Sequence, residues 1–163
     1  MRDTNIKAER TVIVLLRLSM AWVFLYAASH QITVPGWSAT GFLEHTKTFH
    51  WLFAEFTGPV TGPIVSFLVE WGHFAIGLSL LLGFFTRIGA SAGIGLMILY
   101  WMAHMDFPYI SNTNNFLLDE HIVYALVLLL VIVARAGRVF GLDGLLSETS
   151  LVRRNHLLSW AAG

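Results

Sequence analysis

The chain has 163 residues, of which 56% are hydrophobic and only 12% are charged, and its mean hydropathy is +0.67. This composition is too apolar for an ordinary soluble domain and favours an integral membrane protein. The formal net charge is zero, which argues against a nucleic-acid partner. The chain contains no cysteine, which excludes a thiol relay and an iron–sulfur cluster held by thiolates. Redox chemistry would therefore require another bound cofactor or a second subunit.

Four apolar runs are long enough to cross the hydrocarbon core of a bilayer as helices, which takes about 20 residues each. The predicted spans cover residues 11–32, 64–85, 88–105 and 116–134. The first run has no cleavage pattern of small residues and is expected to be a retained signal anchor. We therefore predict an all-α protein that forms a single transmembrane domain over residues 1–163. The expected fold is a four-helix transmembrane bundle, and the expected location is the cell membrane, with a multi-pass topology.

An amphipathic segment lies between the first two spans. Phenylalanine and leucine recur there at helical spacing, at Phe42, Phe49, Leu52, Phe53 and Phe56, while polar residues take the other side. This pattern predicts a short interfacial helix over about residues 40–56 in the outer loop. A lid over a site inside the bundle would show the same pattern.

Basic residues set the expected orientation. Eight of the ten basic residues fall on one side of a four-span arrangement: Arg2, Lys7, Arg10, Arg87, Arg135, Arg138, Arg153 and Arg154. The positive-inside rule then places both termini in the cytoplasm, including a tail over residues 135–163. Lys47 lies on the outer side. Arg17, inside the first span, is expected to have a structural role, either at the interface or against the end of the fourth span.

Six of the seven histidines lie on the outer side of this arrangement, together with most of the acidic residues. Glu70 and His73 lie inside the second span, where exposure of an ionisable group to lipid costs about 2–4 kcal/mol. Such groups normally face the protein interior and pair with one another. We therefore expect an outer-side site whose catalytic side chains are Glu70, His73, His104, Glu120 and His121. Asp119 is expected only to begin the fourth helix.

Three chemistries fit a buried group of imidazoles and carboxylates. The group could transfer protons, it could bind a transition metal, or it could hydrogen-bond the oxygens of a quinone. In the quinone hypothesis, the cofactor-binding residues are Trp101, Tyr124 and His30, with the two aromatic rings as walls. The spacing of Glu70 and His73 matches half of a bundle di-iron motif, but the sequence contains no second Glu-x-x-His.

Four stretches of the chain resemble the DoxX/DoxD-like membrane proteins. They read RLSMAWVFLYAASHQI in the first span, EWGHFAIGLSLLLGFFTRIGA across the second and third, NNFLLDEHIVYALVLLL at the start of the fourth, and ARAGRVFGLDGLL after it. The resemblance extends from about Arg17 to Leu146. It implies a four-helix bundle and, through the DoxD branch, the small membrane subunit of a thiosulfate:quinone oxidoreductase.

Our leading hypothesis is therefore a quinone-interacting subunit of a membrane oxidoreductase, with the lipid bilayer, a membrane quinone and a second protein subunit on the outer side as its partners. Nothing in this chain resembles an extracytoplasmic partner domain, so that subunit must be a separate chain. Two alternatives stay open. One is a non-catalytic scaffold or assembly factor for a redox complex, in which Glu70 and His73 form only a structural pair. The other is a metal-binding membrane protein.

Overall fold

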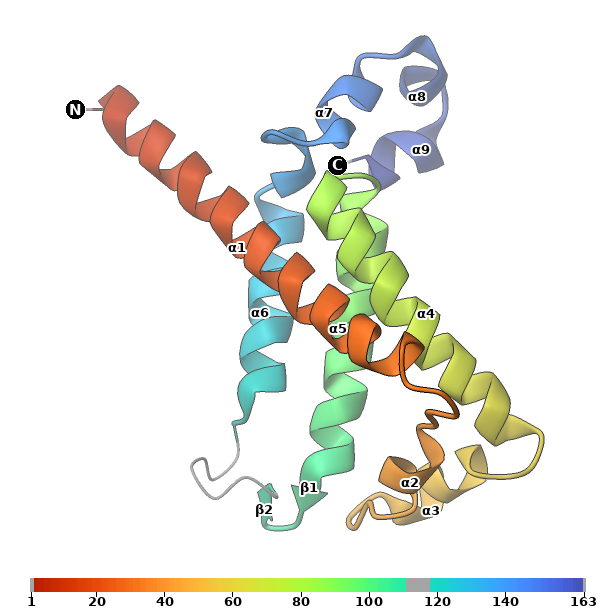
Figure 1. Ribbon diagram of the computed structural model, residues 1–163. Coiled ribbons are helices and arrows are strands. Elements are labelled where there is room, and N and C mark those ends of the chain that lie inside the picture. The colour runs from red at the N-terminus through yellow and green to blue at the C-terminus, as the bar shows by residue number, and fades with distance from the viewer. Residues whose placement is uncertain (1, 111–117, 163) are drawn as a thin grey trace.

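The computed structural model describes residues 2–110 and 118–162, and these residues are mostly helical (Figure 1). The body consists of the longer helices α1 (Arg2–Ile32), α4 (Thr61–Leu82), α5 (Thr86–His104) and α6 (Glu120–Val133). The helix α1 contacts α4, α4 contacts α5, α5 contacts α6, and α6 returns to α1. The prediction of a predominantly helical chain is thus confirmed. It missed a two-stranded antiparallel hairpin of β1 (Met105–Asp106) and β2 (Tyr109–Ile110).

The observed helices lie close to the predicted spans, with α1 beginning nine residues earlier than the predicted residue 11. The helix α4 ends at Gly83, whose φ of 63° is a left-handed conformation that glycine adopts without steric cost. Residues 116 and 117 of the predicted fourth span lie outside the described residues. Within the described chain, two segments are long and apolar enough to cross a membrane, Asn5–Ile32 and Thr61–Leu82, and α6 is a shorter apolar helix.

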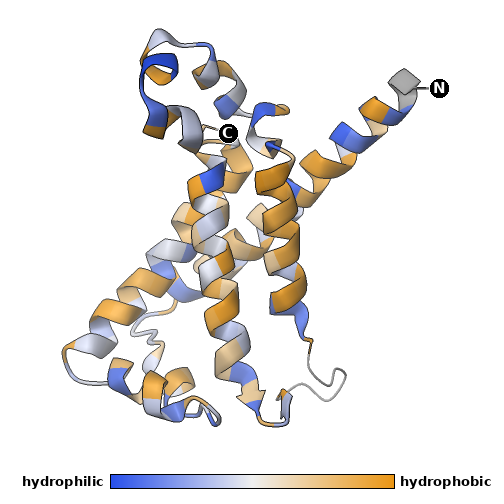
Figure 2. Ribbon diagram, turned by 180° about the vertical axis from the view of Figure 1, so that it is seen from behind, coloured by the Kyte–Doolittle hydropathy of each residue, from blue (hydrophilic) through white to orange (hydrophobic). Residues whose placement is uncertain are grey.

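Large apolar side chains cover the outside of the long helices. Examples are Trp22 on α1, Leu68 on α4 and Val133 on α6, which are 67%, 61% and 72% exposed. Hydropathy colouring shows apolar residues along much of these helices and hydrophilic residues near their ends (Figure 2). A soluble protein rarely exposes so much contiguous apolar surface, whereas lipid solvates it without cost.

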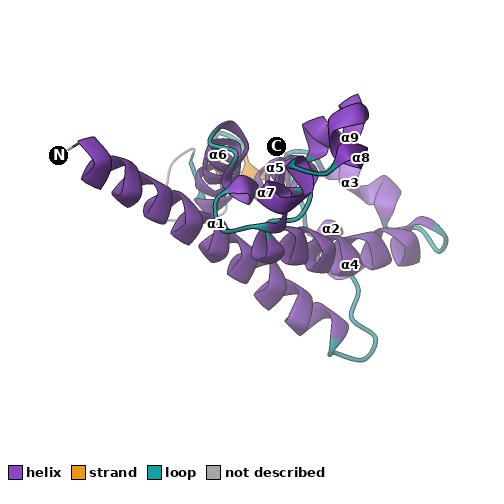
Figure 3. Cartoon of the chain, turned by 90° about the horizontal axis from the view of Figure 1, so that it is seen from above, coloured by secondary structure: helices purple, strands orange, loops and turns teal. Residues whose placement is uncertain are grey.

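The core of this body is built from small and large residues that interdigitate. Buried Phe24 of α1, Leu80 of α4, Met97 of α5 and Leu128 of α6 belong to one cluster. Gly93 of α5 lies where a Cβ atom would come within 2.9 Å of Leu128 and 3.1 Å of Phe24. The helices approach this closely because the position has no side chain. Seen from above, α1 crosses obliquely, and its N-terminal part extends away from the other helices (Figure 3).

The predicted single helix over residues 40–56 is wrong. The segment instead forms α2 (Thr40–Leu43), α3 (His50–Phe53) and the 3-10 turn η1 (Ala54–Phe56). The break has a local cause, because the Thr46 hydroxyl donates to the Leu43 carbonyl at 2.8 Å. Side chains of this kind compete with backbone hydrogen bonds of a helix. The segment still packs inward, since Leu43 and Phe53 are buried with Ala39 and Ala103 in a second apolar cluster.

The opposite end of the molecule contains the α4–α5 turn and the chain after α6. That chain forms η2 (Ala136–Arg138), α7 (Leu142–Ser147), α8 (Ser150–Arg154) and α9 (His156–Ala161). Here Arg17 is buried and donates to the carbonyl oxygens of Ala136, Val139 and Phe140 at 2.6, 3.1 and 3.0 Å. Arg17 therefore has the expected structural role at the end of α6.

Asp143 completes this structural junction. Its carboxylate accepts from the backbone N–H groups of Phe85 and Thr86 at 2.7 and 2.9 Å, and so fixes the α4–α5 turn. A Cβ atom at Gly137 would collide with the side chains of Asp143 and Thr86. The sequence stretches around Gly83, Thr86, Gly137 and Asp143 thus serve to join the helical turn to the chain after α6.

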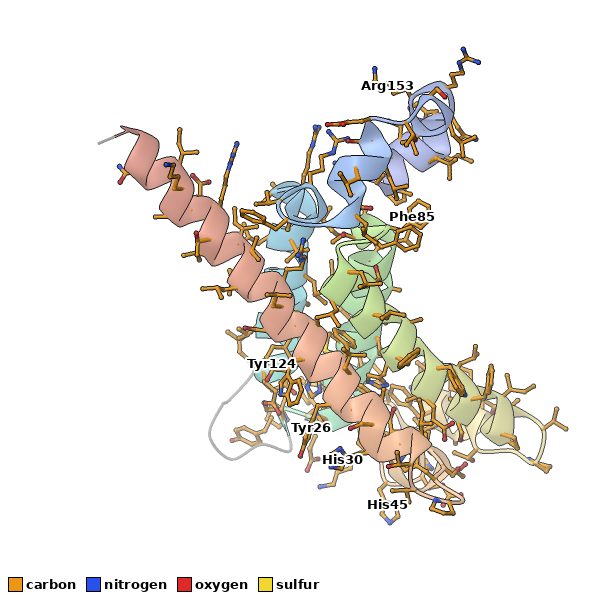
Figure 4. The ribbon with its side chains drawn as sticks, turned by 45° about the horizontal axis from the view of Figure 1, so that its top comes forward. Tyr26, His30, His45, Phe85, Tyr124 and Arg153 are labelled. Carbon is orange, nitrogen blue, oxygen red and sulfur yellow. The ribbon has the colours of Figure 1, made fainter. Side chains whose placement is uncertain are left out.

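We call these two regions the junction end, with α7–α9, and the loop end, with α2, α3, β1 and β2. Both termini and the α4–α5 turn lie at the junction end (Figure 1). Tyr26, His30, His45 and Tyr124 lie toward the loop end, far from Phe85 and Arg153 (Figure 4). Which end faces the cytoplasm stays a prediction from the distribution of basic residues.

Candidate functional site

A cavity of about 290 Å³ lies at the loop end, and we call it the histidine cavity. All four long helices and α2 contribute to it. Its walls are Gln31, Trp37, Ala39, Phe42, Leu43, Val65, Val69, Tyr100, His104 and His121. Mostly apolar walls with a few convergent polar groups are typical of small-molecule sites, whose volumes begin near about 300 Å³.

Asp119 organises the two histidines of this cavity. It is the N-cap of α6, and one carboxylate oxygen accepts from the backbone N–H of His121 at 3.0 Å. The other oxygen lies 3.1 Å from Nδ1 of His121 and 3.3 Å from Nδ1 of His104. The side chain is almost completely buried, at 1% exposed. A single carboxylate therefore holds one imidazole from α5 and one from α6.

The charge of Asp119 decides the protonation pattern of its partners. Asp119 accepts from the backbone N–H of His121 and lies within hydrogen-bond distance of both imidazoles, and hydrogen bonds to the charged form favour the carboxylate. An ionised carboxylate can only accept hydrogen bonds. Each Nδ1 that contacts it must therefore carry the proton. In a neutral imidazole this leaves Nε2 as an acceptor for a ligand.

A second hydrogen-bonded group lies on another wall of the cavity. Nδ1 of buried His73 lies 2.7 Å from the Val69 carbonyl, which can only accept, so this nitrogen carries the proton. Nε2 of His73 then accepts from the Tyr100 hydroxyl at 3.3 Å. The side chain of Gln31 also hydrogen-bonds Tyr100. Oε1 of Gln31 is buried and has no partner among the described residues.

The histidine pair also offers atoms that a metal could use. One ligand atom each from His104, Asp119 and His121 lies within 4.8 Å of the other two. Two imidazoles and one carboxylate form a donor set that suits a divalent transition metal. An imidazole that binds a metal through Nδ1 cannot also donate from Nδ1 to Asp119, so for this ligand atom the two arrangements are exclusive.

The predicted residue Glu70 lies apart from the histidine cavity. It is half-buried and lines a different cavity of about 470 Å³, whose wall includes Ser38 and Ser66. Trp37 lines both cavities, so they adjoin through this indole ring. His73 also does not line the histidine cavity and reaches it through Tyr100.

The remaining predicted residues are more peripheral. Glu120 is exposed, and Trp101 is only partly buried. Tyr124 contacts the ring of His121 edge-on, with ring centroids 6.4 Å apart. His30 is exposed and contacts Tyr26 on its own helix (Figure 4). Of the eight predicted residues, His104 and His121 meet at the cavity, with His73 behind Tyr100 and Tyr124 behind His121.

Three residues of this arrangement were missing from the predicted site. Asp119 is predicted only to begin the fourth helix. This prediction accounts for the oxygen that caps α6, but not for the second oxygen, which contacts Nδ1 of His121. Tyr100 was not among the predicted site residues, although its hydroxyl joins two polar groups. Gln31 follows His30 at the end of a span, and an uncharged polar residue at that depth was the available signal.

Comparison with known proteins identifies the family. The family model DoxX matches residues 12–105, which is more than half of the chain. The chain belongs to the DoxX family. The predicted resemblance is thus shown at the level of the family, and this DoxX protein is a membrane protein, while the match does not specify the thiosulfate:quinone subtype. The matched region includes α4, α5 and His104, and it ends before Asp119 and His121. No curated protein and no solved structure matches the chain.

Proposed function

We propose that this DoxX protein is the quinone-binding membrane subunit of an oxidoreductase, and that the histidine cavity receives the quinone head group. One observation carries the proposal. Two imidazoles, each held at Nδ1 by the buried carboxylate of Asp119, line a cavity that is otherwise largely apolar and aromatic. A quinol ring needs flat apolar walls, and its hydroxyl groups need acceptors. This cavity supplies both.

The wall of the histidine cavity offers both apolar surface and hydrogen-bond acceptors to a quinone. Phe42, Val65 and Val69 offer apolar and aromatic surface to a ring. The acceptors are Nε2 of His104 and Nε2 of His121, since Nδ1 of each ring contacts Asp119. The Tyr100 hydroxyl donates to His73 and already hydrogen-bonds the Gln31 side chain, so it adds polarity to the wall but no further acceptor. A bound quinol would supply two electrons and two protons as it becomes a quinone.

The chain's own residues then handle the protons. Nε2 of His104 or His121 takes a proton from a ligand hydroxyl, and the resulting imidazolium is stabilised by the ionised Asp119 beside Nδ1. In the opposite direction, the imidazolium returns the proton. Glu70 lines the adjoining cavity beyond Trp37, and in this proposal it receives protons that leave the site. Asp119 touches no ligand in this scheme and acts by holding the two rings.

The membrane arrangement belongs to the same proposal. All four long helices cross the cell membrane, with both termini and the junction end in the cytoplasm, as the eight basic residues of that side favour. The histidine cavity then lies toward the outer face. Electrons pass between the quinone and a separate protein subunit on that side, because this chain contains no cysteine for a thiolate-bound centre. A thiosulfate-oxidising subunit is the partner that the DoxD resemblance favours.

Calorimetric titration of the purified protein in detergent with a benzoquinol that lacks a side chain tests this function. We expect saturable binding at one site per chain, weakened in His121→Ala and unchanged in His45→Ala. His45 is the matched control, since it is an exposed histidine at the same end that does not line the cavity. Absence of saturable quinol and quinone binding in the wild type would refute the proposal.

Two further results would favour the alternatives. Elemental analysis of freshly purified protein that found one transition metal per chain, lost in Asp119→Asn, would favour the metal-binding hypothesis. Full biological function after joint replacement of His104 and His121 by phenylalanine would favour a non-catalytic scaffold. Neither result is compatible with head-group binding at the histidine pair.

A further inference from the structure

A second cavity, of about 280 Å³, lies beside the histidine cavity, between α4, α5 and the segment α2–η1. We call it the apolar cavity. Its lining is Phe42, Leu43, Phe53, Phe56, Val65, Leu68, Val69, Leu96, Leu99, Tyr100 and Ala103. The Tyr100 hydroxyl is the one polar side-chain group in this lining. The cavity therefore suits a hydrocarbon chain and offers almost nothing to a polar ligand.

The two cavities adjoin over a broad wall. Five residues line both, namely Phe42, Leu43, Val65, Val69 and Tyr100. These side chains come from α2, α4 and α5, so the shared wall lies where these three elements meet. A molecule with a polar ring in the histidine cavity would thus have its substituents directed along apolar side chains.

The far side of the apolar cavity is formed by side chains on the outside of the protein. Leu68 and Leu99 are 61% and 45% exposed, and Phe56 is 37% exposed. In the membrane arrangement proposed above, these side chains contact lipid. The helices α4 and α5 diverge from their common turn toward this end, and α2 and α3 lie near their separated ends (Figure 1).

We propose that the apolar cavity holds the first part of the hydrocarbon tail of a membrane quinone, and that the quinone reaches the histidine cavity sideways from the bilayer between α4 and α5. This inference rests on the proposed function and adds the route and the ligand class, a quinone with a long apolar tail. The tail gains little affinity on leaving lipid, because lipid chains are as apolar as the cavity. The apolar cavity instead provides room for the tail, so the head group can enter while the tail remains in an apolar environment throughout.

A filling substitution separates tail binding from head binding. Ala103 is buried, lines the apolar cavity and does not line the histidine cavity. Ala103→Phe should therefore occupy the tail position. Ala92→Phe is the matched control, because Ala92 lies on the same helix and is exposed away from either cavity. The ligands are one dimethoxy-methyl-benzoquinone without a side chain and the same ring with a ten-carbon chain.

We expect Ala103→Phe to weaken binding of the tailed quinone by about tenfold or more, because the phenyl ring overpacks the position of the tail. Binding of the tail-less quinone should change less than about twofold, which shows that the neighbouring His104 is undisturbed. Ala92→Phe should leave both affinities as in the wild type. Equal tailed-quinone binding in all three proteins would overturn the tail cavity while leaving the proposed function intact. Failure of both quinones to bind the wild type would overturn both.

A second measurement needs no substitution. A photoreactive diazirine at the fourth carbon of the tail should label residues of α4 and α5 that line the apolar cavity, with Leu68 and Leu99 as the expected sites at its rim. Excess untagged tailed quinone should remove this labelling. Competed labelling confined to α1 or α6 would refute access between α4 and α5.

Discussion

Replacement of Asp119 by asparagine tests whether the carboxylate sets the proton positions of the histidine pair. Asparagine is also a good N-cap residue, so the hydrogen bond to the His121 backbone N–H is retained. The second oxygen, which lies 3.1 and 3.3 Å from the two Nδ1 atoms, becomes an NH2 group that donates. A donor facing Nδ1 favours the tautomer with the proton on Nε2.

The expected effect differs between the two redox forms of the ligand. A quinol hydroxyl that meets Nε2–H loses its acceptor, and an unpaired buried polar group costs about 1–3 kcal/mol. This corresponds to about 5- to 150-fold weaker quinol binding. A quinone oxygen, by contrast, accepts from Nε2–H, so quinone binding should be unchanged or tighter. The ratio of the two affinities is therefore the decisive quantity.

The assay is calorimetric titration in detergent with the tail-less quinol under reducing conditions and with the tail-less quinone under oxidising conditions. Asp106→Asn is the matched control, because Asp106 lies near the same end but its ion pair with Lys47 is exposed to solvent. The side chain of Asp106 is 47% exposed, and that of Lys47 is 61% exposed. An equal loss of quinol and quinone binding would refute the tautomer argument and reduce Asp119 to a structural residue. Unchanged binding of both forms would refute it as well.

Two further predictions concern stability. Tyr100→Phe should lower the free energy of unfolding by about 1–3 kcal/mol, because the hydroxyl that joins buried His73 to Gln31 is lost, and thermal unfolding in detergent will measure this. Arg17→Leu should destabilise by at least about 2–4 kcal/mol, since three carbonyl oxygens at the junction end lose their donor, while quinol affinity of the folded fraction stays the same.

The long helices could be predicted from sequence because apolar length is a local property. The end of the second span was predicted at residue 85, whereas α4 ends at Leu82 because Gly83 takes a positive φ. The segment 40–56 was predicted less well. Its apolar period is helical, but the competing hydroxyl of Thr46 and the inward packing of Leu43 and Phe53 decide where each short helix ends.

The site could be predicted only in part. Sequence placed six of the seven histidines on the outer side, because most of them lie at a span end or in the outer loop. The sequence did not show that the side chains of Glu70 and His73 have different surroundings. The two residues are three positions apart on one helix and therefore about 60° apart around its axis. That angle directs His73 to Tyr100, whereas Glu70 lines the cavity on the other side of Trp37.

The sequence by itself determined that this protein is helical and belongs in a membrane, and that its ionisable residues gather toward one end, because hydrophobicity and charge act along each segment independently. The tertiary structure decided which of the seven histidines share a carboxylate. His104 and Asp119 belong to different elements, and their 3.3 Å contact exists only because α5 packs against α6. The two adjoining cavities likewise depend on the divergence of α4 and α5 and on α2 lying beside them, which no local pattern encodes.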